Sequence, residues 1–327
     1  MKFLVVGLGS MGKRRIRLLK SNYSNIELVG VDTKEDRKKE AEKLFNIKTY
    51  DNLDKAIEIE NPGAVLVCTS PIYHSEIILK CLHKNINIFT EINLLDKNYD
   101  DIISLAKSRN LKLFLSSTFL YRNEIKYIKE RTTKERNLTY RYHVGQYLPD
   151  WHPWESYKDF FVGYKATNGC RELFAIELPW IIDAFGKIES INVVKNKVTN
   201  LEIDYPDNYV VVLKHKNGSI GTLNVDVISR KAIRSFEVYN ENIHLFWEGT
   251  PDTLNEFNIE SKTLENIKVY DEVEKDNRYS ENIIENAYLD ELDAFIKYLN
   301  GDDSLVRYSF EKDKYTLSII DEIEGDN

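Results

Sequence analysis

Short, continuous apolar runs recur through the first third of the chain, at residues 3–7, 26–32, 64–70, 86–91 and 111–117. The runs are rich in β-branched residues, and helical stretches such as 71–85 lie between them. Alternating strands and helices imply parallel strands joined by right-handed crossovers, and continuous apolar runs imply strands covered on both faces. The pattern therefore predicts an α/β domain over residues 1–120, a Rossmann-type doubly wound parallel sheet.

The pattern changes from about residue 135, where strand-like segments follow one another and alternate apolar with polar residues, at 137–145, 189–196, 208–229 and 233–249. Asn217-Gly218 predicts a two-residue hairpin with a type I′ turn, because both residues tolerate positive φ. Helices are expected over 170–185, 281–299 and 310–324. We expect residues 121–327 to form an α+β domain with a mainly antiparallel open sheet, and the C-terminal helix could pack back on the first domain.

The charge balance restricts the class of partner. The chain has a formal net charge of -8 and no basic run, which argues against nucleic acid or an anionic membrane and favours a small molecule. An open antiparallel sheet often exposes one face, and a large exposed face usually becomes an oligomer interface. We expect a homodimer or homotetramer formed through the C-terminal sheet.

The N-terminus and the cysteines indicate a cytoplasmic protein. The chain enters its first strand within three residues and reaches a glycine turn at once, which is too short for a signal peptide or membrane span. Cys68, Cys81 and Cys170 are odd in number and lack zinc-ligand spacing, so neither a disulfide framework nor a structural zinc is expected. We interpret them as reduced thiols, at least two of them packed in cores.

A glycine motif follows the first predicted strand and opens a helix, with the spacing G-x-G-x-x-G. Such glycines allow a tight turn, a close approach to a pyrophosphate and close helix packing, and the helix N-terminus stabilises the anion. Asp32 ends the second strand, where a carboxylate can accept hydrogen bonds from the adenosine ribose and disfavour a 2′-phosphate. NAD is therefore predicted over NADP, although Lys34 leaves some room for NADP. The residues expected at the pyrophosphate are Gly7, Gly9, Ser10, Met11 and Gly12.

The sequence resembles the Gfo/Idh/MocA family of oxidoreductases over nearly the whole chain. The resemblance lies in "GLGSMGKRR", in "CTSPIYHSEIILKCLHKNINIFTEINL", in "YR" at 121–122 and in the helix at 169–186. In the family the second segment looks like T-P-P-x-x-H, a helix and a strand that ends in Glu-Lys-Pro. The resemblance implies a reaction in which a base takes the proton of a sugar hydroxyl while hydride passes to the nicotinamide. The further cofactor contacts that it implies are Thr69, His74, Glu91 and Arg122.

Two departures from the family pattern affect the expected chemistry. The family lysine of Glu-Lys-Pro is Ile92 here, and the proline is Asn93. The family helix commonly carries Asp-x-x-x-His, and the alignment places Glu172 at the aspartate and Ile176 at the histidine. Isoleucine transfers no proton, and general acid/base catalysis is typically worth about 10² to 10⁴ in rate. Either another residue has therefore taken over the proton transfer, or the protein does not catalyse hydride transfer.

Residues 143–180 contain the candidates for an acid/base group that would replace the family lysine and histidine. The segment 143–161 is rich in aromatic and polar residues, which suits stacking on a sugar ring and hydrogen bonding to its hydroxyls, although such a loop can also seal an interdomain core. His152 is the first choice for acid/base work. Arg171 could pair with Glu172, Glu91 or a substrate carboxylate or phosphate. The predicted catalytic set is His152, Glu172, Arg171 and Glu91, with Glu177, Tyr142, Tyr147, Tyr157 and Tyr164 as further candidates.

The leading hypothesis is an NAD-dependent oxidoreductase that acts on a hydroxyl or keto group of a sugar or nucleotide-sugar. One alternative is a catalytically silent dinucleotide-binding protein, acting as a sensor or partner subunit. Another is an elimination or glycoside cleavage assisted by NAD. No metal site is expected. The sequence names neither the substrate nor the direction of the reaction.

Overall fold

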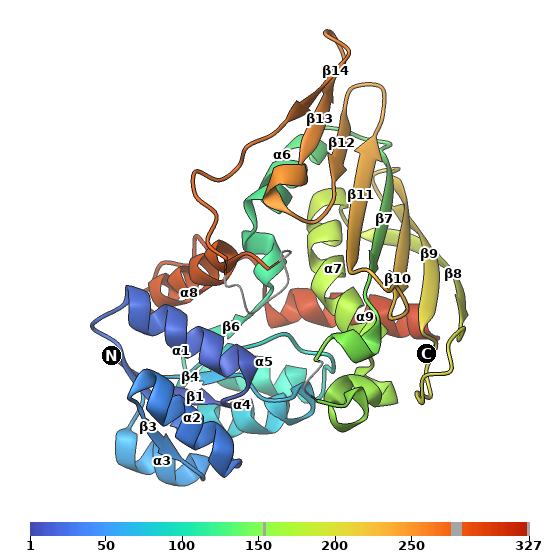
Figure 1. The fold of residues 1–327 in the computed structure, drawn as a ribbon. Coiled ribbons are helices and arrows are strands. Elements are labelled where there is room, and N and C mark those ends of the chain that lie inside the picture. Colours follow the sequence, from blue (N-terminus) through green and yellow to red (C-terminus); the bar gives the residue numbers. More distant parts are fainter. Residues whose placement is uncertain (153–154, 276–282, 326–327) are drawn as a thin grey trace. The chain divides into compact units, whose positions relative to one another are not determined.

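The computed structural model describes residues 1–152, 155–275 and 283–325 (Figure 1). The chain divides into two compact units. The N-terminal unit consists of Met1–Ser117 and Tyr288–Lys314, and the C-terminal unit consists of Thr118–Ala287 and Tyr315–Asn327. The late segment Tyr288–Lys314 therefore belongs to the same unit as the N-terminus of the chain.

The N-terminal unit contains a six-stranded parallel sheet with the order β3-β2-β1-β4-β5-β6. Its strands are β1 (Lys2–Val6), β2 (Glu27–Val31), β3 (Lys48–Tyr50), β4 (Ala64–Val67), β5 (Asn87–Thr90) and β6 (Leu113–Leu115). The predicted doubly wound fold is confirmed, although the pattern did not reveal the three-residue β3. The strand order reverses between β1 and β4, and in such sheets ligands bind at the carboxyl ends of these two strands.

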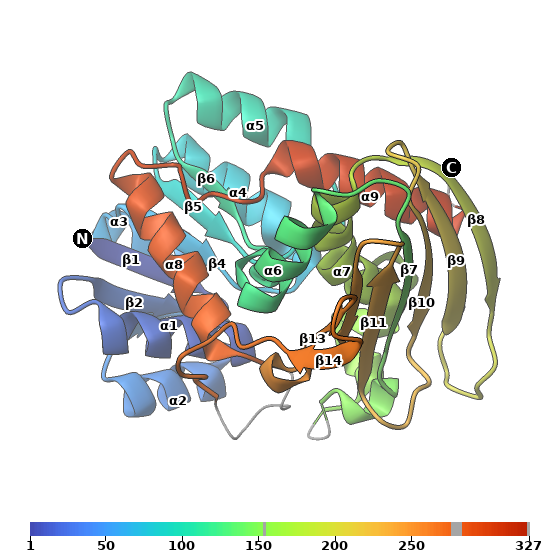
Figure 2. The same cartoon turned by 90° about the horizontal axis from the view of Figure 1, so that it is seen from above.

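Helices cover both faces of this sheet, with α1 and α8 on one face and α4 and α5 on the other (Figure 2). The helices of the unit are α1 (Ser10–Asn22), α2 (Glu35–Phe45), α3 (Leu53–Glu60), α4 (His74–His83), α5 (Tyr99–Ser108) and most of α8 (Glu285–Leu299). Phe295 of α8 packs on Phe3, Phe89 and Phe114, with ring centroids 5.4–5.9 Å apart. The late segment thus completes the apolar core of the N-terminal unit.

The C-terminal unit contains an eight-stranded sheet with the order β14-β13-β12-β11-β7-β10-β9-β8. All neighbours pair antiparallel except β7 and β10, so the predicted mainly antiparallel sheet is confirmed. The pattern missed β13 and β14, which are short and mostly polar. The strands are β7 (Thr139–Gly145), β8 (Ile188–Asn196), β9 (Asn208–His215), β10 (Ile220–Asp226), β11 (Ile233–Tyr239), β12 (His244–Trp247), β13 (Asn255–Asn258) and β14 (Thr263–Asn266).

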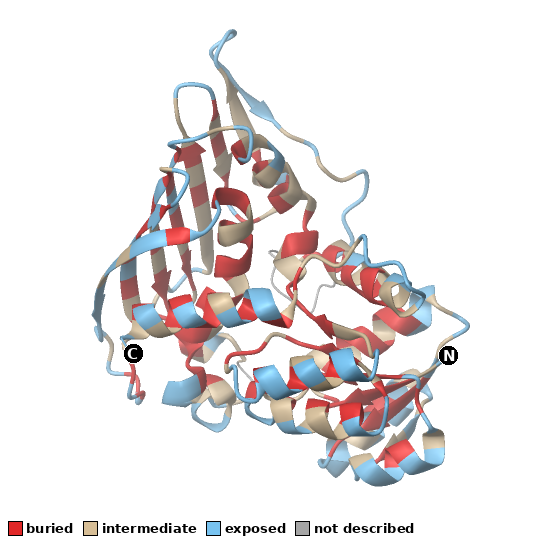
Figure 3. Ribbon diagram, turned by 180° about the vertical axis from the view of Figure 1, so that it is seen from behind, coloured by how far each residue is buried: buried red, intermediate tan, exposed pale blue. Residues whose placement is uncertain are grey.

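One face of this sheet packs on helix α7 (Gly169–Phe185), and burial alternates along the strands (Figure 3). Tyr140 and Tyr142 of β7 are buried, and the Tyr140 ring stacks on Phe185 at 4.3 Å. Arg141, which lies between them, points to the opposite and more exposed face. The remaining helices are α6 (Asn123–Thr132) and α9 (Phe310–Glu324), of which Tyr315–Glu324 belongs to this unit.

The hairpin between β9 and β10 forms as predicted, but its turn type differs. Gly218 has φ +89°, whereas Asn217 does not adopt positive φ, so the predicted type I′ turn is wrong. The Gly218 N–H donates to His215 O, and the Asn217 side chain accepts the Ser219 N–H. Because the asparagine side chain completes the turn, only the glycine needs the left-handed conformation.

The three cysteines are free and buried, as expected. Across the described ranges, no helix combines the length and apolar character needed to cross a bilayer. Residues 281–282, where the penultimate helix was predicted to begin, lie outside the described residues.

Candidate active site

The glycine turn between β1 and α1 is built as its spacing predicts. Gly7 has φ +94°, and a Cβ there would lie 2.6 Å from Cys68 O. A Cβ on Gly12 would lie 1.9 Å from Gly7 O. Both positions therefore require glycine, the first for its backbone conformation and both for the close approach of neighbouring backbone.

The start of α1 can bind an anion. The helix begins at Ser10 with Gly9 as N-cap, no side chain caps it, and its first turn contains no acid. Its first N–H groups and the positive end of the helix dipole can therefore bind a phosphate. A Cβ on Gly9 would meet only Arg37, at 3.7 Å or more, so the backbone is open to a ligand. Ser10 and Met11 lie half-buried in this first turn. These features fit the pyrophosphate of a dinucleotide.

Asp32 lies at the end of β2, where it was expected. Its Oδ2 accepts the Leu8 N–H at 2.7 Å, and its Oδ1 accepts the Lys34 N–H at 2.8 Å. Each carboxylate oxygen can accept more than one hydrogen bond, so Asp32 can also accept from a ribose hydroxyl. The carboxylate links the glycine turn to the loop before α2, the two segments that Figure 1 shows at the start of α1 and α2.

His74 begins α4 and is 1% exposed. Its Nε2 lies 2.9 Å from Thr69 O, and its Nδ1 lies 2.7 Å from the Asn93 side chain. Burial lowers the pKa of His74. Each ring nitrogen lies within hydrogen-bond distance of an oxygen that can only accept, Nε2 of the Thr69 carbonyl and Nδ1 of the Asn93 amide oxygen. The asparagine at the family proline position therefore orients His74.

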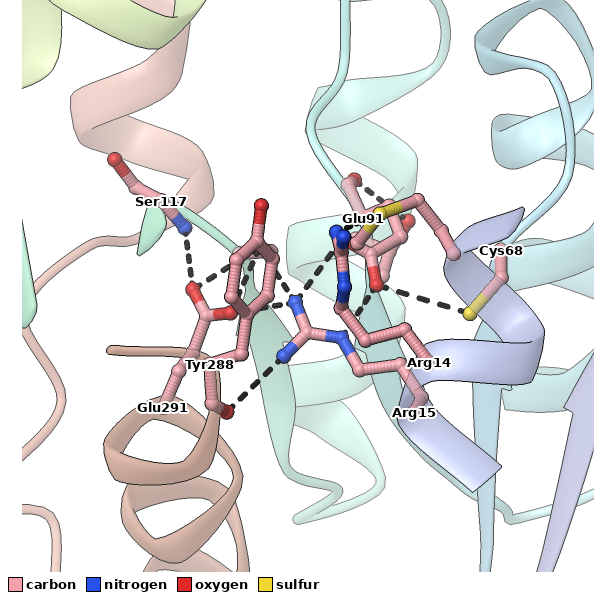
Figure 4. Close-up of polar contacts among 10 residues, drawn as sticks. Arg14, Arg15, Cys68, Glu91, Ser117, Tyr288 and Glu291 are labelled. Carbon is pink, nitrogen blue, oxygen red and sulfur yellow. Dashed lines mark hydrogen bonds and ion pairs between the residues drawn. The ribbon is translucent and has the colours of Figure 1, made fainter. Parts of the chain in front are cut away.

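Glu91 follows β5 and binds Arg15 of α1 (Figure 4). Arg15 Nε donates to Glu91 Oε1 at 2.7 Å, and Nη2 donates to Oε2 at 3.1 Å. The guanidinium lies over the Phe89 ring, 4.7 Å from its centroid, and is fully buried. The carboxylate at the end of β5 is thus fixed by a buried bidentate ion pair.

A second carboxylate, Glu291 of α8, shares the same arginine (Figure 4). Its Oε2 accepts from Arg15 Nη2 at 2.6 Å, and its Oε1 accepts from the Ser117 N–H and from Ser116 Oγ. Burial raises the pKa of Glu291, and Glu91 raises it further, while Arg15 opposes both. Although burial alone would lower the pKa of Arg15, the two carboxylates raise it. We name Arg15, Glu91, Glu291 and Ser116 the arginine cluster.

The local sequence around Glu91 gave no sign of this arrangement, because its partners lie far along the chain. A signal existed in the helices themselves. Arg15 shares the buried stripe of α1 with Gly12, Ile16 and Leu19. A charged residue at a position of the apolar face predicts a buried partner of opposite charge.

In the C-terminal unit, Glu172 lies in the first turn of α7. The residue is half-buried, yet its Oε2 is buried and accepts no hydrogen bond from any described residue. Burial raises the pKa of Glu172 to about 8. A carboxyl group with such a pKa exchanges protons near neutrality, which suits a general acid or base.

Arg171 is directed to other partners. Its Nη2 donates to Asp321 Oδ1 at 2.7 Å and its Nη1 donates to Glu324, both on α9. Both of these partners differ from Glu172, the neighbouring acid considered from the sequence. These contacts favour a structural role for Arg171.

Glu177 is fully buried and has the partners that such a position requires. Its Oε2 accepts from Tyr142 Oη at 2.7 Å and from Trp180 Nε1 at 2.8 Å. Its Oε1 accepts from Arg234 Nε at 3.0 Å. Burial raises the pKa of Tyr142 well above its usual value, so Tyr142 serves here as a hydrogen-bond donor. Glu177 and Tyr142 stabilise the core beneath α7.

The aromatic segment contacts the start of α7. A Cβ on Gly169 would lie 3.5 Å from the Trp151 ring, three residues before Glu172. The His152 ring packs against Phe160 in a tilted arrangement, with centroids 4.4 Å apart, and burial lowers the pKa of His152. Tyr157 accepts the Glu202 N–H in a surface loop, Tyr164 is 53% exposed, and Tyr147 lies under Arg230. Trp154 lies outside the described residues.

Arg122 precedes α6 and is buried. Its Nη2 donates to Gly249 O at 2.9 Å, and its guanidinium pairs with Glu124. The guanidinium lies over the Trp247 ring, 5.0 Å from the centroid. Its contacts in the C-terminal unit hold β12 against α6, and the predicted cofactor contact of Arg122 stays a prediction.

Comparison with known proteins gives the family. Residues 1–115 match the family described as "Oxidoreductase family, NAD-binding Rossmann fold", Gfo/Idh/MocA. The chain is 26% identical over 321 residues to the myo-inositol 2-dehydrogenase of Thermotoga maritima, covering 91% of this chain and 87% of that one. The match places residues 1–115 in the Gfo/Idh/MocA family. The chain is an oxidoreductase with an NAD-binding Rossmann domain, as predicted.

Solved structures show the same fold at low identity. An oxidoreductase from Agrobacterium radiobacter, in complex with NAD+, L-tartaric acid and magnesium, superposes with a TM-score of 0.83 at 11% identity, covering 99% of this chain and 96% of that one. The WlbA dehydrogenase from Chromobacterium violaceum, in complex with NADH and UDP-GlcNAcA, gives a TM-score of 0.77 at 15% identity, covering 99% and 92%.

That Ile92 and Ile176 occupy the positions of the family's proton-handling residues stays a prediction from the sequence. Ile92 and Ile176 are both half-buried, not part of a sealed core. Ile176 lies one helical turn after Glu172, so the two side chains share a face of α7. Glu172, whose pKa burial raises to about 8, thus lies beside the position at which the sequence predicts that the family histidine is replaced.

Proposed function

We propose that the protein is an NAD-dependent oxidoreductase acting on a hydroxyl or keto group of a sugar or nucleotide-sugar, with Glu172 as its general acid and base. The observation that carries the proposal is the Glu172 carboxyl group. It has a buried oxygen without a hydrogen-bond partner among the described residues and a pKa raised to about 8 by burial.

The raised pKa explains how a carboxyl group can do the work of a histidine. An ordinary glutamate is fully ionised at neutral pH and is a weak base. Glu172 exists in both forms near neutrality, so it can accept a proton from a hydroxyl or return one to a carbonyl oxygen. Bound NAD would supply the hydride acceptor. Residues Gly7, Gly9, Gly12 and Asp32 would hold its pyrophosphate and adenosine ribose.

Two lines of support favour a sugar as the substrate class. The Trp151 ring lies against Gly169, in the same turn of α7 as Glu172, and indole faces stack on the C–H faces of sugar rings. The related proteins are named as an inositol dehydrogenase and a dehydrogenase bound to UDP-GlcNAcA. His152, beside Trp151, would contact hydroxyl groups of the same substrate.

We also propose that the protein works in the cytoplasm as a homo-oligomer formed through the face of the C-terminal sheet that lies opposite α7. The strand register places four exposed aliphatic side chains on that face, namely Val194, Val210, Val212 and Ile220. Three buried free cysteines fit a reducing compartment.

The test is turnover with a matched pair of variants. The purified protein is incubated with NAD and either myo-inositol or a panel of UDP-sugars, and absorbance is followed at 340 nm. We expect oxidation to rise with pH through about 8, as Glu172 loses its proton. Glu172→Gln should lower kcat by about 10² to 10⁴ and leave NADH binding unchanged.

The control is Glu202→Gln, which removes an exposed glutamate paired with Lys158 and should leave kcat unchanged. Binding of NADH without turnover of any substrate in the panel would favour the catalytically silent alternative. A Glu172→Gln variant with an unaltered pH profile would contradict the role of Glu172 alone.

A further inference from the structure

The segment that follows β5 contains a buried hydrogen-bond donor that the described side chains do not satisfy. Asn93 is 2% exposed. Its Oδ1 lies 2.7 Å from His74 Nδ1, whereas its Nδ2 is buried and has no hydrogen-bond partner among the described residues. Because an unsatisfied buried donor is costly, this amide indicates a small polar ligand within reach of Nδ2.

A small cavity borders this amide. Its volume is about 10 Å³, and His74, Asn93 and Tyr99 line it together with aliphatic side chains of α4 and α5. A cavity of this size holds about one water molecule, provided that two or more polar groups face it. Since the Asn93 oxygen is paired with His74, the nitrogen is the atom of this side chain that remains to bind a water.

Tyr99 supplies the second polar group. It is the first residue of α5, and its hydroxyl donates to Oδ2 of Asp313, which is buried in the first turn of α9. A phenol has one proton to donate, so its oxygen can only accept from a further partner. Burial and the Asp313 carboxylate raise the pKa of Tyr99 well above its usual value, whereas the nearby Asn93 amide lowers it. The two groups therefore lie close together at the cavity, without a direct hydrogen bond between the amide nitrogen and the hydroxyl.

His74 connects Asn93 to the glycine turn. Its Nε2 lies 2.9 Å from the carbonyl oxygen of Thr69, which follows β4. A Cβ on Gly7 would lie 2.8 Å from Thr69 N, so this backbone packs against the turn between β1 and α1. Ligands of such sheets bind at the carboxyl ends of these two strands. A displacement of His74 would therefore be passed to the backbone beside the dinucleotide site.

We propose that the cavity binds one water molecule, and that Asn93 is a positioning residue that acts through this water and His74 on the cofactor site. The water accepts from Asn93 Nδ2 and donates to Tyr99 Oη, which completes a chain of polar contacts from Asp313 to Thr69. Proline, the residue of the family pattern at this position, has no side-chain donor, so this chain of contacts requires the asparagine. The inference needs the dinucleotide site alone and not the proposed role of Glu172.

A double-mutant cycle on NADH binding, measured by titration calorimetry on the full chain, tests this inference. Asn93→Leu and Tyr99→Phe should each weaken NADH binding by about threefold to tenfold, the effect of one lost hydrogen bond. Because both substitutions remove the same water, the double variant should bind NADH as each single variant does. Independent effects would instead multiply to about tenfold to a hundredfold.

Tyr308→Phe is the matched control, because the Tyr308 hydroxyl donates to the other oxygen of Asp313, at 2.9 Å, and the described lining of the cavity does not include it. Its effect on NADH binding should be less than about threefold and should multiply with that of Asn93→Leu.

A crystal structure of the unmodified protein tests the inference even if a variant does not fold. It should show an ordered water within about 3.2 Å of both Asn93 Nδ2 and Tyr99 Oη. A dry cavity, multiplying effects of Asn93→Leu and Tyr99→Phe, or unchanged NADH binding in both would overturn the inference. The expected binding without turnover of any substrate would contradict only the proposed function.

Discussion

Glu91 in the N-terminal unit and Glu172 in the C-terminal unit are both shielded carboxyl groups that the sequence predicts as catalytic, and they differ in their partners. Glu91, at the end of β5, receives two hydrogen bonds from the buried Arg15 (Figure 4). Glu172, at the start of α7, has a buried oxygen without a partner among the described residues, and its pKa is raised to about 8. A carboxylate held by a cation positions its surroundings, whereas one without a cation can exchange a proton near neutrality.

This difference reassigns the roles expected from the sequence. Glu91 was predicted as both a catalytic and a cofactor-binding residue, and its ion pair with Arg15 favours the positioning role. Glu172 was predicted as a catalytic residue at the position of the family aspartate. This contrast is the reason for which we propose Glu172, in the C-terminal unit, as the general acid and base.

The largest effect is expected from Arg15→Met, which leaves Glu91 and Glu291 buried together without their cation. We expect the free energy of unfolding to fall by about 3–5 kcal/mol, because each buried charge loses its compensation. Urea denaturation at pH 7 measures the change. Lys13→Met, on the same helix and paired with Glu40 near the surface, should cost at most about 1 kcal/mol.

Glu91→Gln sharpens this comparison, because Arg15 keeps Glu291 as its partner. The variant should be less destabilised than Arg15→Met, since it removes one of two carboxylates that repel each other. If Glu91→Gln were the more destabilising of the two, the arginine cluster would not be organised around Arg15.

A second effect appears as a difference in pH dependence. Glutamate ordinarily titrates near pH 4.5, and folded Glu172 titrates near pH 8. Between these values the folded state binds more protons than the unfolded state, so this group lowers stability as pH rises. Glu172→Gln should therefore gain stability relative to the unmodified protein from pH 5 to pH 8, in urea denaturation at each pH.

The exposed Glu202 provides the control for that measurement. Its pKa is lowered through a hydrogen bond with Lys158, so its titration lies below this pH window. Glu202→Gln should give a constant difference from pH 5 to pH 8. A constant difference for Glu172→Gln as well would show that Glu172 has an ordinary pKa, and its proposed role would then fail.

The fold was predictable because its signals are local. Apolar runs gave five of the strands of the parallel sheet, and alternation gave the central strands of the other sheet. The pattern failed at β3, β13 and β14, which are short and have little apolar character, so register with a neighbouring strand decides their structure. The turn at Asn217 was wrong because a side-chain hydrogen bond replaced the expected backbone conformation.

The candidate site was predictable only in part. Gly7, Gly12 and Asp32 follow from spacing, because a strand, a turn and a helix fix their geometry. The partners of Arg15 and Arg171 do not, because Glu91, Glu291 and Glu324 lie 76, 276 and 153 residues away in the sequence. Spacing also cannot show that Glu172 has a buried oxygen without a described hydrogen-bond partner, because this depends on how all the side chains around α7 pack.

The smallest effect on catalysis is expected from Arg171→Gln. Its guanidinium is held by Asp321 and Glu324, and Glu324 is largely buried. The variant should lose about 1–3 kcal/mol of stability, because the largely buried Glu324 carboxylate loses the charged donor with which it pairs. Its kcat should stay within about threefold of the unmodified enzyme, since no step is proposed to use Arg171. A fall in kcat as large as that of Glu172→Gln, with stability preserved, would show that Arg171 acts on the substrate. The contrast on α7 between the paired charge of Arg171 and the Glu172 oxygen without a described hydrogen-bond partner would then not separate their roles.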